Sequence, residues 1–335
     1  MGPAADLTVV VLSWNTRELT LAALRAVPAA CAPFRVRTVC VDNASADGTV
    51  EAVRRALPEV VVLEAGGNLG YARGNNLALP TAQGRAIVFL NSDTAPRAGA
   101  LAHVLRYLDA HAEVGIVCPR LVFPDDTPQR AAWGLPTAAA LLHQFTPLGW
   151  LGVGRADVRR ARPDRGAVER TGEVEAVSGA CLAIRSDLCD RLGGFDPGYP
   201  FYFEDVDLCA RAKASGARVH VVTDGPPVVH HGGASSAIAE GATRLPLLTG
   251  ALRFQRRRLS PARYAAFALA FKTGVVARSL VELLRAPLYA TVRRARGRRE
   301  RSERTWRTAR ERAHFLERDV LPFLRAELGR PWRRG

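Results

Sequence analysis

The first hundred residues alternate between short apolar runs and segments whose apolar residues recur at helical spacing. The first run, residues 7–13, is apolar almost throughout, which is typical of a parallel strand buried on both faces. We expect further strands at residues 36–41, 60–63 and 87–90. We expect helices at residues 17–26 and 49–57. This alternation predicts βαβ units and an α/β fold with a mostly parallel sheet flanked by helices.

The later part of the chain has a less regular pattern. We expect one strand over residues 174–184 and another over 218–222, followed by a turn at 224–227. From residue 244 onward the pattern is helical and rich in arginine. We therefore predict a main domain over residues 1–243, with halves of about 1–118 and 119–243, and an α-helical extension over 244–335.

Charge is distributed very unevenly between these two regions. The chain has a net charge of +15, but residues 244–335 contain 24 basic and only 7 acidic residues, so the rest is close to neutral. A region this basic requires an anionic partner, such as lipid headgroups, nucleic acid or a phosphorylated substrate. The sequence contains no helix-turn-helix, zinc-finger or RNP-like motif, so we do not expect nucleic acid.

An apolar segment inside the basic region, residues 264–289, is interrupted by charged residues and is a poor candidate for a spanning helix. As an amphipathic helix, it could lie in the interface of an anionic membrane. It could instead cap the main domain, with its arginines in solvent. The residues that could face a surface are Phe267, Leu269, Phe271, Val275, Leu280, Leu283 and Leu284.

The cysteines and the N-terminus bear on the compartment. The six cysteines form no C-x-x-C pair, which favours reduced thiols over a disulfide framework or a structural zinc site. No basic stretch followed by an apolar run opens the chain, so we expect no signal peptide. Both features favour a cytoplasmic protein.

Polar clusters follow three of the expected strands, at residues 13–15, 42–43 and 91–93. Each cluster could be an ordinary turn, because Asn and Asp are common turn residues. Ligands of open parallel sheets bind at the carboxyl ends of the strands, however. Three such clusters on one sheet indicate a binding edge.

A glycine-rich stretch at residues 66–76 follows the third strand. Its glycines would allow a ligand to approach the backbone, and Arg73 could lie near a diphosphate. The stretch lacks the spacing of a dinucleotide fingerprint or a P-loop. A simple helix-opening loop is the alternative.

Asp93 and His230 are candidate metal ligands. Hard cations such as Mg²⁺ or Mn²⁺ take carboxylate oxygens and bridge to substrate phosphates with few protein ligands. A turn containing His230 and His231 beside two glycines is the alternative for the histidine.

Two adjacent carboxylates, Glu204 and Asp205, follow three aromatic residues at 201–203. A carboxylate shielded by aromatic side chains at a loop-to-helix junction is a candidate general base. Acidic residues in the first turn of an ordinary helix would give the same pattern.

Taken in order, these motifs resemble the family 2 glycosyltransferases, and most closely the rhamnosyltransferase-like branch. The resemblance covers roughly residues 7–240. It rests on the first strand with Ser13-Trp14-Asn15, on VDNASADGT at 41–49, on NLGYARGNN at 68–76, on FLNSD at 89–93, on SGA at 178–180, on GFD at 194–196 and on EDVDL at 204–208.

The resemblance implies a GT-A fold with a Rossmann-like nucleotide half and a role for each motif. Asp42 would bind the imide N–H of uracil or thymine. The other donor-side residues would be Ser13, Asn15, Asn68, Arg73, Asn76, Asn91 and Asp93. In the family's D-x-D position this chain has Asn91 in place of the first Asp, which leaves Asp93 with His230 to hold Mg²⁺ or Mn²⁺.

The resemblance also implies the acceptor side of the site. Asp205 would be the catalytic base, supported by Glu204. The acceptor would be lined by Gly179, Ala180, Phe201, Tyr202 and Phe203.

The implied reaction is an inverting transfer of a sugar from a nucleotide-diphospho-sugar, expected to be dTDP-L-rhamnose, to a glycan or polyprenyl-linked cell-envelope acceptor. A UDP-sugar carrying galactofuranose, glucose or N-acetylhexosamine is the alternative donor. A catalytically silent basic binding protein is the alternative of another class. We expect peripheral attachment to the inner face of the plasma membrane through residues 244–335.

Overall fold

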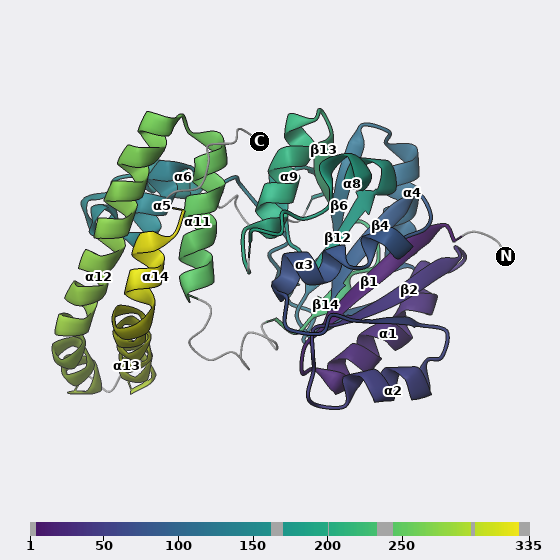
Figure 1. The fold of residues 1–335 in the computed structure, drawn as a ribbon, viewed down its shortest axis with the longest axis horizontal. Coiled ribbons are helices and arrows are strands. Elements are labelled where there is room, and N and C mark those ends of the chain that lie inside the picture. Colours follow the sequence, from purple (N-terminus) through teal and green to yellow (C-terminus); the bar gives the residue numbers. More distant parts are fainter. Residues whose placement is uncertain (1–4, 162–169, 200, 233–243, 296–298, 328–335) are drawn as a thin grey trace. The chain divides into compact units, whose positions relative to one another are not determined.

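The computed structural model describes residues 5–161, 170–199, 201–232, 244–295 and 299–327. The chain forms two compact units (Figure 1). The first contains residues 1–135 and 162–239, and the second contains 136–161 and 240–335. Residues 136–161, which the sequence placed in the acceptor half, therefore group with the C-terminal helices.

The first unit is built around an eight-stranded mixed sheet of order β10-β13-β6-β12-β4-β1-β2-β3. The pairs β1–β2, β1–β4, β2–β3 and β6–β13 are parallel, and β12 runs antiparallel to both β4 and β6. The strands are β1 (Leu7–Ser13), β2 (Val36–Asp42), β3 (Val61–Glu64), β4 (Ala86–Asn91), β6 (Val114–Pro119), β10 (Gly172–Glu173), β12 (Cys181–Arg185) and β13 (Arg218–Val222).

Two small sheets extend this unit. One has the order β5-β14-β7-β8 and the other pairs β11 with β9. Their strands are β5 (Thr94–Pro96), β14 (Val228–His230), β7 (Leu121–Val122), β8 (Pro128–Gln129), β11 (Ala176–Val177) and β9 (Ala132–Trp133).

Helices cover the large sheet on both faces, as the complete burial of the consecutive residues Val9, Val10 and Val11 requires. They are α1 (Arg17–Cys31), α2 (Thr49–Ala56), α3 (Gly70–Asn76), the short η1 (Leu79–Thr81), α4 (Ala100–Ala110), α8 (Ser186–Leu192) and α9 (Glu204–Ala214). The four strands and two helices predicted for the first hundred residues are confirmed, with α1 running five residues longer than expected.

The single strand predicted over 174–184 is wrong. The structure has two strands there, β11 and β12, and they belong to different sheets. The break lies at Gly179, whose backbone groups bond to side chains instead of a neighbouring strand: its carbonyl accepts from the Tyr71 hydroxyl at 2.6 Å and its N–H donates to Asp205 at 2.9 Å. Sequence pattern cannot reveal that kind of partner.

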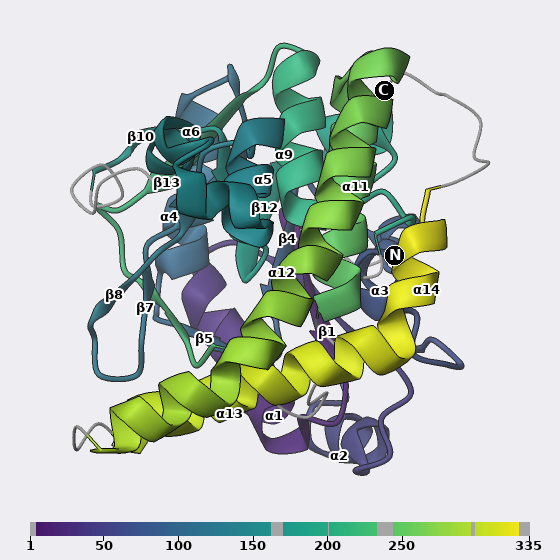
Figure 2. The same cartoon turned by 90° about the vertical axis from the view of Figure 1, so that its left-hand side faces the viewer.

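The second unit is helical. It consists of α5 (Ala138–Phe145), η2 (Pro147–Leu151), α6 (Arg155–Ala161), α11 (Arg244–Arg258), α12 (Pro261–Ala295), α13 (Arg299–His314), the π-helical turn η3 (Phe315–Asp319) and α14 (Val320–Arg325). The long α12 packs against both α13 and α5 (Figure 2). None of the described helices combines the length and the apolar character needed to cross a membrane.

Candidate active site

The polar clusters at the strand ends lie together at one edge of the large sheet. Ser13 is in register with Asp42 on the neighbouring β2, and Leu12 is in register with Asn91 on β4. Because β1, β2 and β4 are parallel, their carboxyl ends meet at this edge, where a ligand of an open α/β sheet binds.

Asp42 presents an acceptor at this edge. Its side chain is 3% exposed, and its Oδ2 accepts a hydrogen bond from the Ser45 N–H at 2.9 Å. Its Oδ1 is buried and has no hydrogen-bond partner in the described part of the chain. A buried carboxylate oxygen without a donor is costly unless a ligand supplies one.

Asn15 and Ser13 have different positions relative to this edge. Asn15 adopts a left-handed conformation (φ 52°), and its Oδ1 accepts from the Ala46 N–H at 2.7 Å, which ties the β1–α1 turn to the loop after β2. Ser13 is fully buried, and its hydroxyl bonds to the Thr20 hydroxyl at 2.7 Å. The Ser13 hydroxyl therefore stabilises the turn between β1 and α1 from inside the protein.

The glycine-rich stretch opens α3 and is anchored by asparagines. The Asn68 Oδ1 accepts from the Gly70 N–H at 3.0 Å. Asn43 belongs to the cluster at 42–43 but had no separate role in our sequence-based prediction. It is buried and holds the stretch to β2: its Oδ1 accepts from the Leu69 N–H at 3.0 Å and its Nδ2 donates to the Gly70 carbonyl at 3.1 Å. Arg73 is exposed beside this anchor and donates to the Pro197 carbonyl at 3.1 Å.

Asn76 is committed to the protein backbone. Its Nδ2 donates to the Phe195 carbonyl at 2.7 Å, and its Oδ1 accepts from the Phe195 N–H at 3.0 Å. Both polar groups of the side chain that we expected at the nucleotide thus hold the Gly194–Phe195 segment against α3.

Asp93 and His230 face each other across the β5–β14 pair. The Nε2 of His230 lies 3.3 Å from Oδ1 of Asp93 yet has no hydrogen-bond partner among the described residues. The His230 Nδ1 lies 2.6 Å from Oε1 of Gln129 on β8. An amide oxygen only accepts, so Nδ1 carries a proton, and in the neutral imidazole Nε2 then keeps its lone pair.

Two electron-pair donors, the His230 imidazole and the Asp93 carboxylate, therefore point at the same place. The Oδ1 of Asn91 is a further buried oxygen without a hydrogen-bond partner in the described ranges. The imidazole and the carboxylate, 3.3 Å apart, suit a small divalent cation. No group of three or more His, Cys, Asp or Glu side chains that could hold a metal occurs among the residues described.

Glu204 and Asp205 begin α9 in a strained backbone. The two residues before them, Tyr202 and Phe203, both have left-handed φ values, 68° and 72°. Such conformations cost about 1–3 kcal/mol each for residues with side chains. Nothing in three consecutive aromatic residues predicts this geometry, which aims the start of α9 at the Gly179 turn.

The two carboxylates differ in their partners. Oδ2 of Asp205 accepts from the Gly179 N–H at 2.9 Å, and Oδ1 accepts from the Val206 N–H at 2.8 Å. Glu204 is 6% exposed, and its Oε2 is buried without a hydrogen bond to the described chain. Burial raises the pKa of Asp205, opposed by these two backbone N–H groups, while burial and the charge of Asp205 raise the pKa of Glu204.

The third carboxylate of α9, Asp207, is structural. It pairs with Arg211 at 2.7 Å and accepts from the Tyr199 hydroxyl at 3.1 Å. Arg211 also donates to the carbonyls of Leu192 and Gly194, at 2.9 Å each. This network fixes α9 to the end of α8.

Tyr71 connects the sheet edge with α9. Its hydroxyl donates to the Gly179 carbonyl, and its pKa is raised well above the usual value by burial and by the negative charges of Glu204, Asp205 and Asp93. The carboxylates that the sequence placed in the catalytic and metal positions therefore all raise the pKa of the buried Tyr71 hydroxyl. Tyr71 lies inside a motif that we recognised, but no role followed for it from the sequence.

The residues expected to line the acceptor lie around the same turn. Phe201 and Tyr202 are half-buried, with ring centroids 4.4 Å apart, whereas Phe203 is 9% exposed and mostly packed inside. The carbonyl of Ala180 accepts from the Asn91 N–H at 3.0 Å, which joins this turn to β4.

Comparison with known proteins identifies the family. A family model described as "Glycosyltransferase like family 2" matches residues 3–240. The chain is a family 2 glycosyltransferase. The fold is similar to that of the mannosyltransferase PcManGT from Pyrobaculum calidifontis, whose structure is in complex with GDP-Man and Mn²⁺. The two superpose with a TM-score of 0.53 at 21% identity, covering 94% of this chain and 88% of that one. The predicted GT-A fold is confirmed.

Relatives of this glycosyltransferase include rhamnosyltransferases. It is 29% identical over 214 residues to the N-acetylglucosaminyl-diphospho-decaprenol L-rhamnosyltransferase of Mycobacterium tuberculosis, a match that covers 58% of this chain and 66% of the relative. It is 25% identical over 165 residues to the rhamnosyltransferase WbbL of Escherichia coli, which covers 47% of this chain and 59% of WbbL. The chain thus spans less than two thirds of the length of these relatives.

Proposed function

We propose that this glycosyltransferase is metal-dependent and inverting, and that it moves L-rhamnose from dTDP-L-rhamnose to a glycan or polyprenyl-linked acceptor of the cell envelope. The observation that carries the proposal is the Asp205 carboxylate, which is held by two backbone N–H groups at the start of α9 and has a raised pKa. A base with a raised pKa takes a proton more readily at neutral pH than an ordinary aspartate does.

In the proposed reaction the acceptor hydroxyl oxygen attacks the anomeric carbon while the bond from that carbon to the diphosphate oxygen breaks. Asp205 takes the hydroxyl proton, on the side of the sugar opposite the leaving diphosphate, so the configuration inverts. Each of its oxygens accepts one backbone hydrogen bond and keeps a further lone pair for this proton. Glu204, buried beside it, supports this position of Asp205.

The donor nucleotide would lie at the carboxyl ends of β1, β2 and β4. The unpartnered Oδ1 of Asp42 would accept the imide N–H of thymine or uracil. The rhamnosyltransferase names of two relatives favour the thymidine-linked donor. A UDP-sugar remains the alternative, because the same imide occurs in both bases.

Asp93 and His230 would hold Mg²⁺ or Mn²⁺, and Asn91 would add an oxygen. When bound, the cation would neutralise charge on the leaving diphosphate. Gln129 would fix the imidazole in the tautomer that leaves Nε2 available, as outer partners of metal-ligating histidines do. Arg73, exposed near the opening of α3, would contact the diphosphate.

The proposed place of action is the inner face of the plasma membrane. Residues 244–335, with 24 basic and 7 acidic residues, would attach the enzyme to anionic lipid. This attachment would bring the site to a lipid-linked acceptor.

A transfer assay with dTDP-L-rhamnose and UDP-sugars, Mg²⁺ or Mn²⁺ and a polyprenyl-linked acceptor tests the proposal. Loss of the base in Asp205→Asn should lower transfer by about 10²- to 10⁴-fold. Asp190→Asn, which alters an exposed carboxylate on α8, is the matched control and should leave transfer unchanged. Wild-type protein without turnover of any of these donors would favour the catalytically silent binding protein.

A further inference from the structure

Helix α12 is apolar on two opposite sides. Its inner side packs into the helical unit: Phe271 and Val275 are fully buried, and the Phe271 ring lies 5.9 Å from that of Phe145 and 6.2 Å from that of Phe323. The sequence expectation that Phe267, Phe271 and Val275 could face a surface is therefore wrong. Those residues form the core of this unit.

The other side of α12 carries a stripe of exposed leucines. The exposed fractions are 68% for Leu269, 48% for Leu280, 79% for Leu284 and 68% for Leu288. Spacings of four and eleven residues keep side chains on one side of a helix, so these four form a stripe roughly 28 Å long. We call it the leucine stripe.

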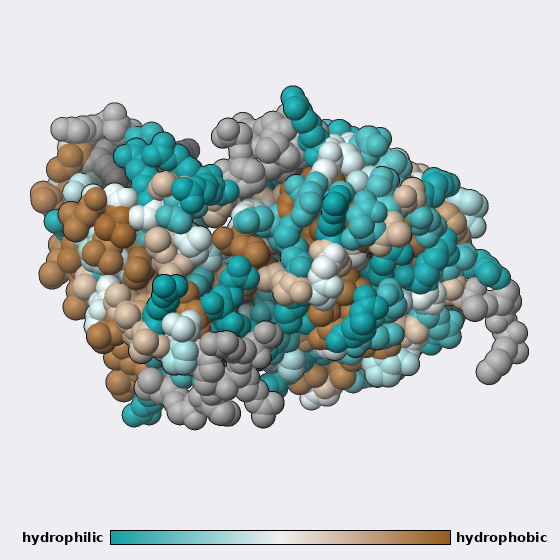
Figure 3. Space-filling model, turned by 90° about the horizontal axis from the view of Figure 1, so that it is seen from above, coloured by the Kyte–Doolittle hydropathy of each residue, from teal (hydrophilic) through white to brown (hydrophobic). Residues whose placement is uncertain are grey.

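The apolar side of a helix normally packs against a partner. Here the helical unit covers only one side of α12. The space-filling view shows apolar residues gathered on the surface of the helical unit (Figure 3). Leu151, which is 80% exposed on η2, adds to the exposed apolar surface of this unit. Exposed apolar surface of this extent on one helix marks an interaction site.

Aromatic and basic residues lie next to the leucine stripe. Trp150 and Tyr289 are 49% and 47% exposed. The guanidinium groups of Arg278 and Arg285 lie 5.8 Å and 5.4 Å from the centre of the Trp150 ring. Leucines flanked by Trp, Tyr and Arg are the composition of a surface that rests in the headgroup layer of a membrane.

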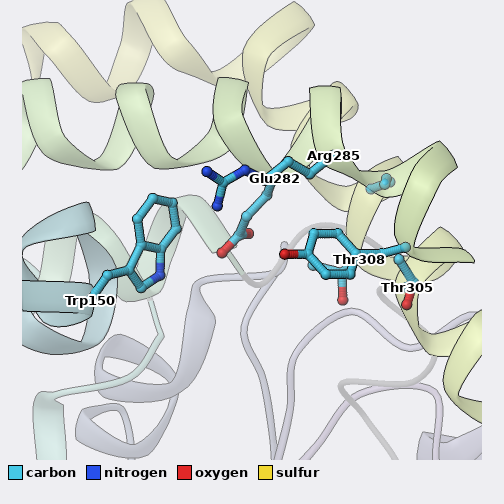
Figure 4. Close-up of a pocket in the computed structure, with 8 residues that line it drawn as sticks. Trp150, Glu282, Arg285, Thr305 and Thr308 are labelled. Atoms are coloured by element: carbon cyan, nitrogen blue, oxygen red, sulfur yellow. The ribbon is translucent and has the colours of Figure 1, made fainter. Parts of the chain in front are cut away.

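A pocket of about 470 Å³ is lined by residues of α12, α13 and η2 (Figure 4). Its wall includes Trp150, Glu282 and Arg285. Glu282 is already paired with Arg278 at 2.6 Å and Arg312 at 2.7 Å. No carboxylate of the described chain is ion-paired with Arg285, whose charge is thus available to an anion.

We infer that the leucine stripe docks onto an anionic lipid bilayer, with the four leucines in the acyl-chain boundary and Arg285 at the level of the lipid phosphates. The inference rests on the membrane attachment in the proposed function and names the surface that makes it. The charge of the surrounding region favours an anionic bilayer over an uncharged partner, because residues 244–335 contain 24 basic and only 7 acidic residues.

The test is flotation of the full-length protein with two kinds of vesicle, equimolar phosphatidylglycerol–phosphatidylcholine and phosphatidylcholine alone. The wild type should float with the anionic vesicles and far less with the neutral ones. Leu284→Gln with Leu288→Gln should lower binding by about tenfold or more for each inserted leucine. Leu321→Gln with Leu324→Gln, two exposed leucines of α14 outside the stripe, is the matched control and should float like the wild type.

Charge is tested separately by Arg285→Gln, which should lower binding to anionic vesicles by about fivefold and leave binding to neutral vesicles unchanged. Equal flotation of the Leu284/Leu288 variant and the wild type would overturn the inference. So would light scattering that shows a wild-type dimer and a monomeric Leu284/Leu288 variant, because a second copy would then cover the stripe.

The same preparations separate this inference from the proposed function. Hydrolysis of a free nucleotide-sugar does not require a membrane, so the stripe variants should retain the wild-type hydrolysis rate while losing flotation. A wild type that floats but turns over no donor would remove the proposed function and leave the docking surface intact. Unchanged circular dichroism and thermal midpoints confirm that the variants are folded.

Discussion

The paired hydrogen bonds between Asn76 and the Phe195 backbone give a direct test of whether this side chain serves the fold or the nucleotide. Phe195 is fully buried, and its N–H and C=O both bond to Asn76. Asn76→Ala would leave two buried backbone groups without these partners. Each such group costs about 1–3 kcal/mol, so the free energy of unfolding should fall by about 2–6 kcal/mol.

The measurement is urea unfolding of the full chain followed by circular dichroism and tryptophan fluorescence. Asn76→Asp should be destabilising too, because it keeps the acceptor for the Phe195 N–H but sets a carboxylate oxygen against the Phe195 carbonyl. Asn68→Ala is the control: Asn68 is exposed and its Oδ1 accepts from Gly70, so the loss should stay below about 1 kcal/mol.

The sequence-based prediction makes the opposite forecast for Asn76. If it borders the nucleotide, Asn76→Ala should raise the KM for the donor and leave the free energy of unfolding within about 0.5 kcal/mol of the wild type. That outcome would refute the structural reasoning.

Three further predictions follow from the site. Because burial raises the pKa of Asp205, transfer by the deprotonated base should rise with pH through a value above the usual aspartate range. A pH profile of kcat/KM without this shifted limb would contradict the assignment. The same raised pKa means that the contribution of Asp205 to the free energy of unfolding is lost as pH rises through that pKa. Gln129→Leu should weaken Mn²⁺ binding, measured by calorimetry with the nucleotide present, by about 10- to 100-fold, and unchanged affinity would remove Gln129 as a partner of His230. Gly194→Ala should destabilise the protein by more than about 1 kcal/mol in urea unfolding. Gly194 has φ +69°, and a Cβ there would lie 2.6 Å from Oδ1 of Asn76. An unchanged free energy of unfolding would mean that this segment can move.

Features set by local sequence pattern could be predicted, whereas features set by contacts between residues distant in the sequence could not. The strands of the nucleotide half were predictable because a buried parallel strand requires a continuous apolar run, as Leu7–Ser13 shows. The meeting of the polar strand ends at one edge followed from the topology of a parallel sheet. The roles of Asn68 and Asn76 were not separable, because both lie in one motif and differ only in their partners. Asn68 accepts from Gly70 and Asn43, whereas Asn76 bonds to Phe195, more than a hundred residues away.

Two further features could not be read from local pattern for related reasons. The apolar residues of α12 looked like one amphipathic set, but Phe271 is buried and Leu284 is 79% exposed, a division set by which side the helical unit covers. The left-handed backbone at Tyr202 and Phe203 opposes local preference. Surrounding structure has to impose such a conformation, and residues that depart from local preference are expected at functional sites.

The break between β11 and β12 explains why that strain is retained. In a continuous strand the N–H and C=O of Gly179 would bond to neighbouring strands, and neither could reach a side chain. In the broken strand the N–H holds Asp205 and the C=O holds Tyr71, at 2.9 Å and 2.6 Å. Asp205 reaches this N–H only if α9 begins where the left-handed Tyr202 and Phe203 start it. The interrupted strand and the strained turn are therefore two halves of one arrangement that holds the carboxylate in place.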